Sequence, residues 1–172
     1  MNKENNHFWI LYIHDIFYGH SYKNSVVLNP TTLWIVGGYD PDFNHLNSSE
    51  FIKLDKPSTI GPELPFQISG HSMIKLSYNA IFIIGGFQNG FISKKTWIID
   101  PSDGFNIREG PSLNTRRYGH SCAKMISNGK IVLMVAGGRD DSSYLDTVEM
   151  LKIDSNSAIS KNWVFGKYSI NI

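Results

Sequence analysis

A Gly-Gly doublet ends an apolar run three times along this 172-residue chain, and its near-constant spacing constrains the fold more than any other feature. The doublets are Gly37-Gly38, Gly85-Gly86 and Gly137-Gly138, which are 48 and 52 residues apart. Each doublet follows a run dominated by aliphatic and β-branched residues, at 33–36, 81–84 and 131–136. Self-similarity at a period of roughly 20 to 50 residues indicates stacked copies of one supersecondary unit.

The tripeptide Gly-His-Ser is a second repeated marker. It starts at Gly19, Gly70 and Gly119, at intervals of 51 and 49 residues. A motif that recurs in every unit belongs to the scaffold, whereas a catalytic site breaks the symmetry. We therefore expect the histidines to be structural, with rings that hydrogen-bond to the backbone in or beside the innermost strand of each unit. These histidines are His20, His71 and His120.

The segments between the markers have the pattern of short strands. Each triplet opens an alternating run, and a polar turn separates this run from the apolar strand that ends in Gly-Gly. A polar loop follows, then a third hydrophobic run ending near Asp55, Asp100 or Asp154, and finally a weaker fourth segment. Short β-type runs bounded by turn residues predict strands, and no helical periodicity of comparable strength competes with them. The sequence predicts an all-β fold with four strands in each unit.

Together, the Gly-His-Ser triplet, the apolar strand with Gly-Gly and the strand with a trailing Asp resemble the kelch repeat, one blade of a β-propeller. The third unit matches best, with Arg117, Gly129-Lys130-Ile131, Tyr144 to Glu149 and Trp163 in addition to the shared motifs. The resemblance implies four-stranded antiparallel blades at residues 19–69, 70–118 and 119–172. Residues 1–18 would then be the last strand of a preceding blade.

Three blades are too few to close a ring, because propellers have about 4 to 8. The outer faces of the first and third units would leave apolar patches larger than monomers normally expose. The chain is therefore expected to be a portion of a longer propeller, a truncated product, or half of a six-bladed ring completed by a homodimer. The first of these is favoured.

Composition and charge disfavour several partner classes. Lys and Arg number 16 against 15 Asp and Glu, a balance that argues against nucleic acid. The longest apolar stretch near the start is residues 8–13, which is too short to span a membrane. Cys122 is the only cysteine and is expected to be a small core thiol. Scarcity of cysteine is weakly typical of cytoplasmic proteins, and the compartment otherwise stays open.

The chain carries no motif that predicts catalysis. GxSxG, HExxH and Gly-rich phosphate loops are all missing from the sequence, so we expect no enzyme activity, no cofactor and no metal. The resemblance leaves one alternative, since a galactose-oxidase-like propeller also carries kelch units and binds copper through Tyr and His. A fragment of such an enzyme or of a sugar-binding propeller is therefore the second hypothesis, for which Tyr118, Tyr144 and Tyr168 match by residue type only.

The loops that depart from the repeat are the expected binding surface, because loops on a rigid scaffold carry recognition. The resemblance implies that the loops after Gly-Gly, with the connections into the innermost strands, form one face that holds a protein or peptide. It also implies that Arg117 and Arg139 face the ligand. The full set of expected binding residues is Tyr39, Asp40, Phe87, Gln88, Asn89, Arg117, Arg139, Asp140 and Tyr144.

Overall fold

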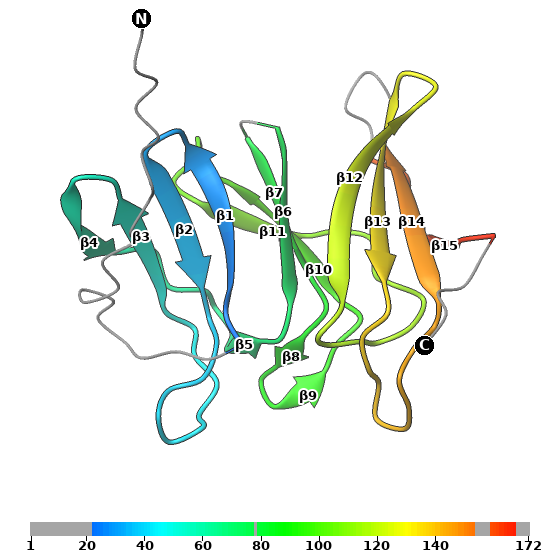
Figure 1. Cartoon of the computed structure of the whole chain (residues 1–172), viewed down its shortest axis with the longest axis horizontal. Helices are drawn as coiled ribbons and strands as arrows, with labels where there is room; N and C mark the ends of the chain where they lie inside the picture. The colour runs from blue at the N-terminus through cyan, green and yellow to red at the C-terminus, as the bar shows by residue number, and fades with distance from the viewer. Residues whose placement is uncertain (1–21, 78, 154–158, 168–172) are drawn as a thin grey trace, which may run out of the picture.

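The computed structural model describes residues 22–77, 79–153 and 159–167, and these residues are organised as β-sheets without a helix. Three four-stranded antiparallel sheets stand side by side, in the order in which the chain forms them (Figure 1). The prediction of an all-β fold with four-stranded units is confirmed. The described residues form no closed ring, which is consistent with an incomplete propeller.

Neighbouring strands of each four-stranded sheet follow one another along the chain. The first sheet contains β1 (Asn24–Asn29), β2 (Thr32–Val36), β3 (Ser49–Lys53) and β4 (Lys56–Ile60). The second contains β6 (Ser72–Ser77), β7 (Ala80–Ile84), β10 (Thr96–Asp100) and β11 (Asn106–Glu109). The third contains β12 (Ser121–Ser127), β13 (Lys130–Ala136), β14 (Val148–Ile153) and β15 (Val164–Phe165). A small sheet of β5 (Ile68–Ser69), β8 (Phe87–Gln88) and β9 (Phe91–Ile92) lies at one end of the second sheet.

Two hydrophobic clusters lie between the sheets and hold them together. Val26, Trp34 and Val36 of the first sheet belong to one cluster with Ile81 and Ile83 of the second. Phe82 and Ile84, on the other side of β7, belong to the second cluster, which includes Leu133, Val135 and Leu151 of the third sheet. The four residues Ile81 to Ile84 are fully buried because β7 has a neighbouring sheet on each side.

All six glycines of the doublets have positive φ, which explains why the apolar strands end in this residue. The second glycine of a doublet also lies against the residue that leads into the innermost strand. A Cβ at Gly86 would come within 2.8 Å of the His71 Cβ, and one at Gly138 within 2.9 Å of the His120 Cβ. Both the backbone angle and the close approach therefore require glycine.

A backbone ladder links the three units and sets their true register. The Gly70 N–H donates to the Tyr22 carbonyl at 2.9 Å, and the Gly119 N–H donates to the Gly70 carbonyl at 2.8 Å. All three residues are left-handed, with φ of 56°, 58° and 63°. Tyr22 thus occupies the position that glycine holds in the other two units.

The expected equivalence of the first Gly-His-Ser triplet with the other two is consequently wrong. Asn24, Ser72 and Ser121 pair with the residue that precedes each Gly-Gly doublet, so Asn24 is the counterpart of the two serines. Lys23 therefore stands where His71 and His120 stand in the later units. His20 itself lies outside the described residues, as does the expected strand at 1–18.

Candidate functional site

The three loops that follow the Gly-Gly doublets emerge at the same ends of the sheets, along the lower edge of Figure 1. They cover residues 39–45, 87–91 and 139–144. The segments that lead into β6 and β12, at 68–70 and 117–119, lie on the same side and are called the lead-in segments here. β5 pairs with β8 in the second unit, and Tyr118 pairs with Arg139 in the third, so each lead-in segment is hydrogen-bonded to the loop of its own unit.

Five rings form a continuous row across this loop face. The ring centroids lie 5.8 Å apart for Tyr22 and Tyr39, and 4.6 Å apart for Tyr39 and His45. They are 5.5 Å apart for His45 and Phe87, and 4.5 Å apart for Phe87 and Tyr118. Tyr22 is 67% exposed and the other four rings are half-buried. This set, called the aromatic row below, joins side chains from all three units.

Arg139 and Tyr144 extend the row in the third unit. The backbone of Arg139 bridges both Tyr118 and Tyr144, so its loop begins as a short hairpin beside the row. The Arg139 guanidinium carbon lies 5.3 Å from the centre of the Tyr144 ring, and Tyr144 is 70% exposed. No salt bridge to Arg139 is present among the described residues, so its charge is available to an incoming carboxylate. Nearby, Arg116 is 2.9 Å from Asp141 in an exposed ion pair.

Loop carboxylates and amides hold the loops in shape. Asp40 Oδ1 accepts the backbone N–H groups of Asp42 and Asn44, and Asp140 Oδ1 accepts those of Ser142 and Ser143 at 2.7 and 2.8 Å. The hydrogen bonds from Ser142 and Ser143 lower the pKa of Asp140. Asp40 and Asp140 lie in loops of the loop face, where their Oδ1 atoms organise the turns.

Asn89 has a comparable role in the second unit. It is exposed, adopts a left-handed φ of 49° before Gly90, and exchanges hydrogen bonds with the backbone of Gln67. Gln88, by contrast, is buried: its Nε2 donates to the Gly85 carbonyl and its Oε1 accepts from Trp97 Nε1, each at 3.3 Å. The expectation that Gln88 faces a ligand is wrong, because an alternating strand turns it toward the interior.

The expectation that Arg117 faces a ligand is also wrong, because its side chain is fully buried. Its guanidinium contacts Glu149 Oε1 at 2.8 Å and donates to the Gly137 and Thr147 carbonyls. Arg117 is therefore a structural cation rather than a ligand-facing one.

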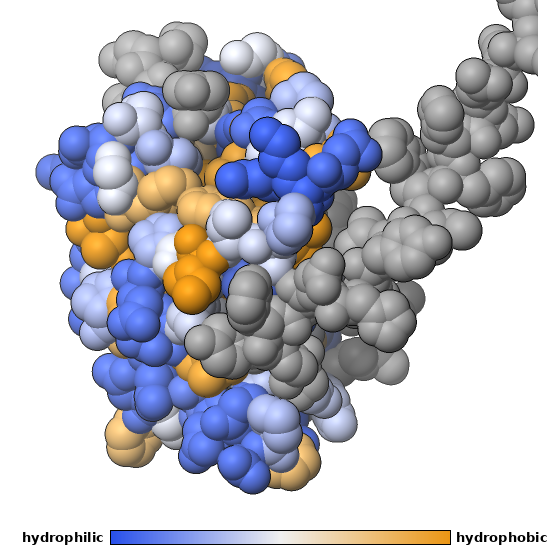
Figure 2. Space-filling model, turned by 90° about the vertical axis from the view of Figure 1, so that its left-hand side faces the viewer, coloured by the Kyte–Doolittle hydropathy of each residue, from blue (hydrophilic) through white to orange (hydrophobic). Residues whose placement is uncertain are grey.

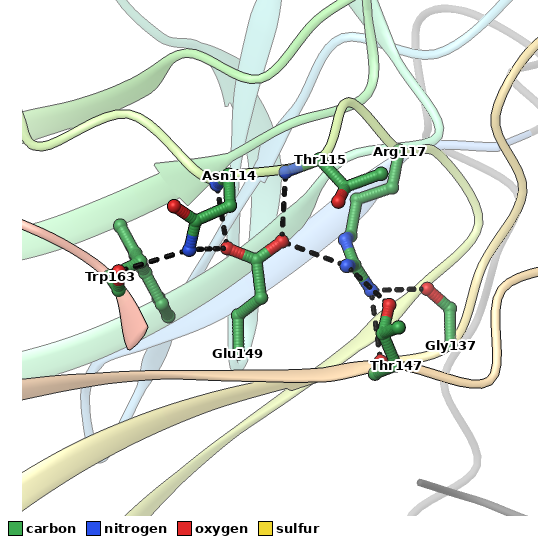
Figure 3. Close-up of polar contacts among 7 residues, drawn as sticks. All are labelled: Asn114, Thr115, Arg117, Gly137, Thr147, Glu149 and Trp163. Carbon is green, nitrogen blue, oxygen red and sulfur yellow. Dashed lines mark hydrogen bonds and ion pairs between the residues drawn. The ribbon is translucent and has the colours of Figure 1, made fainter. Parts of the chain in front are cut away.

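Glu149 completes this buried network and binds the chain just before Arg117 (Figure 3). Its carboxylate accepts from the backbone N–H groups of Asn114 and Thr115 at 2.7 and 3.0 Å, and from the Asn114 side-chain amide at 3.0 Å. The same amide donates to the Trp163 carbonyl. The network fastens the lead-in segment of the third unit to its sheet.

His71 and His120 are buried, in keeping with a structural role. Neither ring makes a hydrogen bond of ordinary geometry with the described residues, although the Ile84 backbone interacts with the His120 ring and opposes the lowering of its pKa. Burial, followed by the neighbouring His120 ring, lowers the pKa of His71 to about 3. Burial, followed by the Arg117 charge, lowers the pKa of His120 to about 3. Both rings are therefore neutral at physiological pH.

Cys122 lies half-buried against the second hydrophobic cluster, and burial raises the pKa of its thiol to about 11. Its surroundings therefore favour the unreactive thiol form. In the part of the chain that the structure describes, His, Cys, Asp and Glu side chains form no group that could hold a metal ion. The same part contains no helix long and apolar enough to cross a membrane.

Three members of the aromatic row were missed as binding residues: Tyr22, His45 and Tyr118. Tyr118 precedes a repeated glycine, and Tyr22 occupies the corresponding glycine position in the first unit. Their proximity depends on how adjacent units pack, which a single sequence does not specify. Comparison of the chain with protein-family models and with curated proteins finds no match.

Proposed function

We propose that this chain is a kelch-type propeller segment that binds a protein partner without catalysis, through its loop face. The aromatic row carries the proposal, because it brings partly exposed rings from three units into contact with one another. Rigid aromatic rings contribute large contact areas at low entropic cost and are frequent energetic anchors of interfaces. A set of rings contributed by three units suits a peptide that spans those units better than a small ligand.

Charge near the row indicates the chemistry of the partner. Arg139 can pair with a carboxylate through two parallel hydrogen bonds, and its neighbour Tyr144 can pack against the adjacent peptide residue. Aromatic or aliphatic peptide side chains would lie against the half-buried rings of Phe87 and Tyr118. The proposed ligand is therefore an acidic peptide segment with apolar residues beside its Asp or Glu.

The experiment is a selection of displayed random 12-residue peptides on the purified chain, followed by affinity measurements with a synthetic copy of an enriched peptide. We expect enrichment of Asp or Glu next to apolar residues. Arg139→Ala and Tyr118→Ala should each weaken binding roughly 30-fold, the equivalent of about 2 kcal/mol for an anchor residue. Arg139→Ala should leave the melting temperature unchanged.

Arg108→Ala is the matched control, since Arg108 is an exposed arginine on β11 outside the loop face. Its removal should not change the affinity. Equal losses of affinity for Arg139→Ala and Arg108→Ala would show that the peptide is bound by nonspecific charge attraction. A large fall in the melting temperature of Arg139→Ala would assign that residue to the scaffold instead.

A further inference from the structure

The first and third sheets each present an apolar face that no other described sheet covers. On the third sheet, Ala123, Met125, Met134, Met150 and Val164 share one face, since their strands are paired in register and side chains alternate. Met125 is 49% exposed and Val164 is 48% exposed. This set is called the third open face.

The third open face is built from positions that are covered in the other two units. By strand register, Met134 corresponds to Trp34 of the first sheet and Phe82 of the second. Trp34 and Phe82 are essentially fully buried, because each packs toward the sheet of the next unit. Met134 occupies the same position with no next sheet among the described residues.

The first sheet exposes the face that, on the second and third sheets, packs against the preceding unit. Val27, Leu33, Ile35 and Ile52 share the face that points away from the second sheet, and this set is called the first open face. On the second sheet the counterparts of Leu33, Ile35 and Ile52 are Ile81, Ile83 and Ile99, which are buried against the preceding unit. On the side of the molecule that the first sheet forms, apolar surface reaches solvent between polar side chains (Figure 2).

Polar contacts between the innermost strands also repeat from unit to unit. Asn24 Nδ2 donates to the His71 carbonyl at 3.1 Å, and Ser72 Oγ donates to the His120 carbonyl at 2.7 Å. Lys75 Nζ donates to the Leu28 carbonyl, and Lys124 Nζ donates to the Leu76 carbonyl. The chain thus makes one type of interface twice, and the two open faces supply its two halves a third time.

We propose that two copies of this chain join head to tail, the third open face of each covering the first open face of the other, to close a six-sheet ring. Six sheets lie within the range of about 4 to 8 that propellers use. A second copy is the occupant because it presents the matching half of an interface already made twice within the chain. Ser121 of one copy then donates to the Lys23 carbonyl of the other, and Met125 lies beside Val27.

The first test is the mass of the purified chain in solution, measured by light scattering across micromolar concentrations. We expect a species of twice 19.4 kDa whose mass stays constant as the concentration rises further. A monodisperse monomer at all concentrations would overturn it. An open-ended series of larger species would also overturn it, because a head-to-tail contact that does not close builds filaments.

Single substitutions then distinguish the head-to-tail ring from other dimers. Met125→Glu and Val27→Glu alter opposite halves of the interface at exposed side chains, and each should convert the dimer to a folded monomer. Val27→Lys should keep the dimer, because it installs the lysine that the other two units use at this position. Phe91→Glu, on the loop face at 78% exposure, is the control and should also stay dimeric.

Far-UV circular dichroism and a cooperative melt establish that each variant is folded. A dimer that survives Val27→Glu would show that the first open face is not involved, which overturns the proposal. Equal dissociation by Val27→Lys and Val27→Glu would overturn it as well. If Met125→Glu does not fold, Met125→Lys on the same exposed side chain replaces it.

Discussion

The second and third units attach the lead-in segment to its sheet through chemically different side chains. Ile68 and Arg117 are counterparts, since the Gly38 N–H donates to the Ile68 carbonyl and the Gly86 N–H donates to the Arg117 carbonyl, each at 2.8 Å. Trp97 and Glu149 are counterparts by strand register. The second unit therefore joins its lead-in segment to its sheet with apolar side chains, whereas the third unit uses a buried ion pair.

The difference shows what a buried charge requires in this fold. Glu149 is satisfied by Arg117 and by donors of the preceding chain, so the ion pair comes with a complete set of partners for the carboxylate. The second unit places Phe66 against Trp97 instead, with ring centroids 4.7 Å apart. A buried pair contributes little by itself and costs much when one partner is lost, so the two solutions should respond differently to mutation.

The largest expected effect comes from removing one member of the ion pair. Arg117→Ile should lower the free energy of unfolding by about 3 to 5 kcal/mol, because it leaves the Glu149 carboxylate buried without its cation. The double variant Arg117→Ile with Glu149→Trp reproduces the residue pair of the second unit and should recover part of that loss. Urea unfolding followed by tryptophan fluorescence measures both. A loss below about 1 kcal/mol for Arg117→Ile would contradict the comparison.

In the second unit the matching substitution removes only packing. Ile68→Ala should cost about 2 to 4 kcal/mol, since Ile68 is fully buried in the first hydrophobic cluster. Ile126→Ala is the control: this side chain is 75% exposed and its truncation should cost less than about 0.5 kcal/mol. Similar losses for the two alanines, again by urea unfolding, would show that the lead-in segment contributes little to stability.

The two buried histidines, His71 and His120, predict a pH dependence of stability. Their pKa values fall from 6.5 in the unfolded chain to about 3 in the folded one, so below pH 6.5 the unfolded chain binds more protons. Stability is therefore complete above pH 6.5 and declines as the pH falls toward 3. At pH 5.5 the loss is about 1.4 kcal/mol for each imidazole.

Urea unfolding at pH 7.5 and 5.5 measures this loss, and His71→Gln should reduce it by about half. The counterpart of these histidines in the first unit is Lys23, a residue of a different type. Burial lowers its pKa, while the Glu50 charge acts in the opposite direction. An unchanged pH dependence in His71→Gln would show that His71 is already solvated in the folded protein.

The smallest expected effect lies in the loops. Asp140→Ala removes the acceptor of two backbone N–H groups at the surface and should lower the melting temperature slightly. Asp141→Ala, which removes only an exposed ion pair with Arg116, should change stability by less than about 0.5 kcal/mol. Thermal melts of both variants compare the two carboxylates directly.

The strand pattern of this fold could be predicted from sequence because period-2 runs and Gly-Gly doublets are local signals. The sequence contained one signal against equating the first Gly-His-Ser triplet with the other two. The first two triplets are 51 residues apart, whereas the first two doublets are 48 apart. Tyr22 is the first-unit counterpart of Gly70 and Gly119, but a search by residue identity does not find it because it is not a glycine. Its equivalence is visible only in its left-handed φ and its backbone hydrogen bond.

The candidate site was only partly predictable for a different reason. Arg139, Tyr39 and Phe87 follow the doublets directly, so their places on the loop face follow from the repeat. The burial of Arg117 depends on Glu149, which lies 32 residues away on another strand. That pairing is a tertiary contact with no local signal, and an arginine in a connecting segment is ordinarily a surface residue.

Each lead-in segment is hydrogen-bonded to both the preceding unit and its own unit, and this determines where the chain tolerates a break or an insertion. The Arg117 carbonyl accepts from Gly86 of the second unit, whereas Tyr118 pairs with Arg139 of the third. New chain ends placed at this apparent boundary would disrupt both units. The turn at Asn128 and Gly129 is exposed, and no atom beyond its immediate neighbours lies within 4 Å of a Cβ built on Gly129. Insertion of a few residues should therefore be tolerated at that hairpin tip and should destabilise the protein between the units.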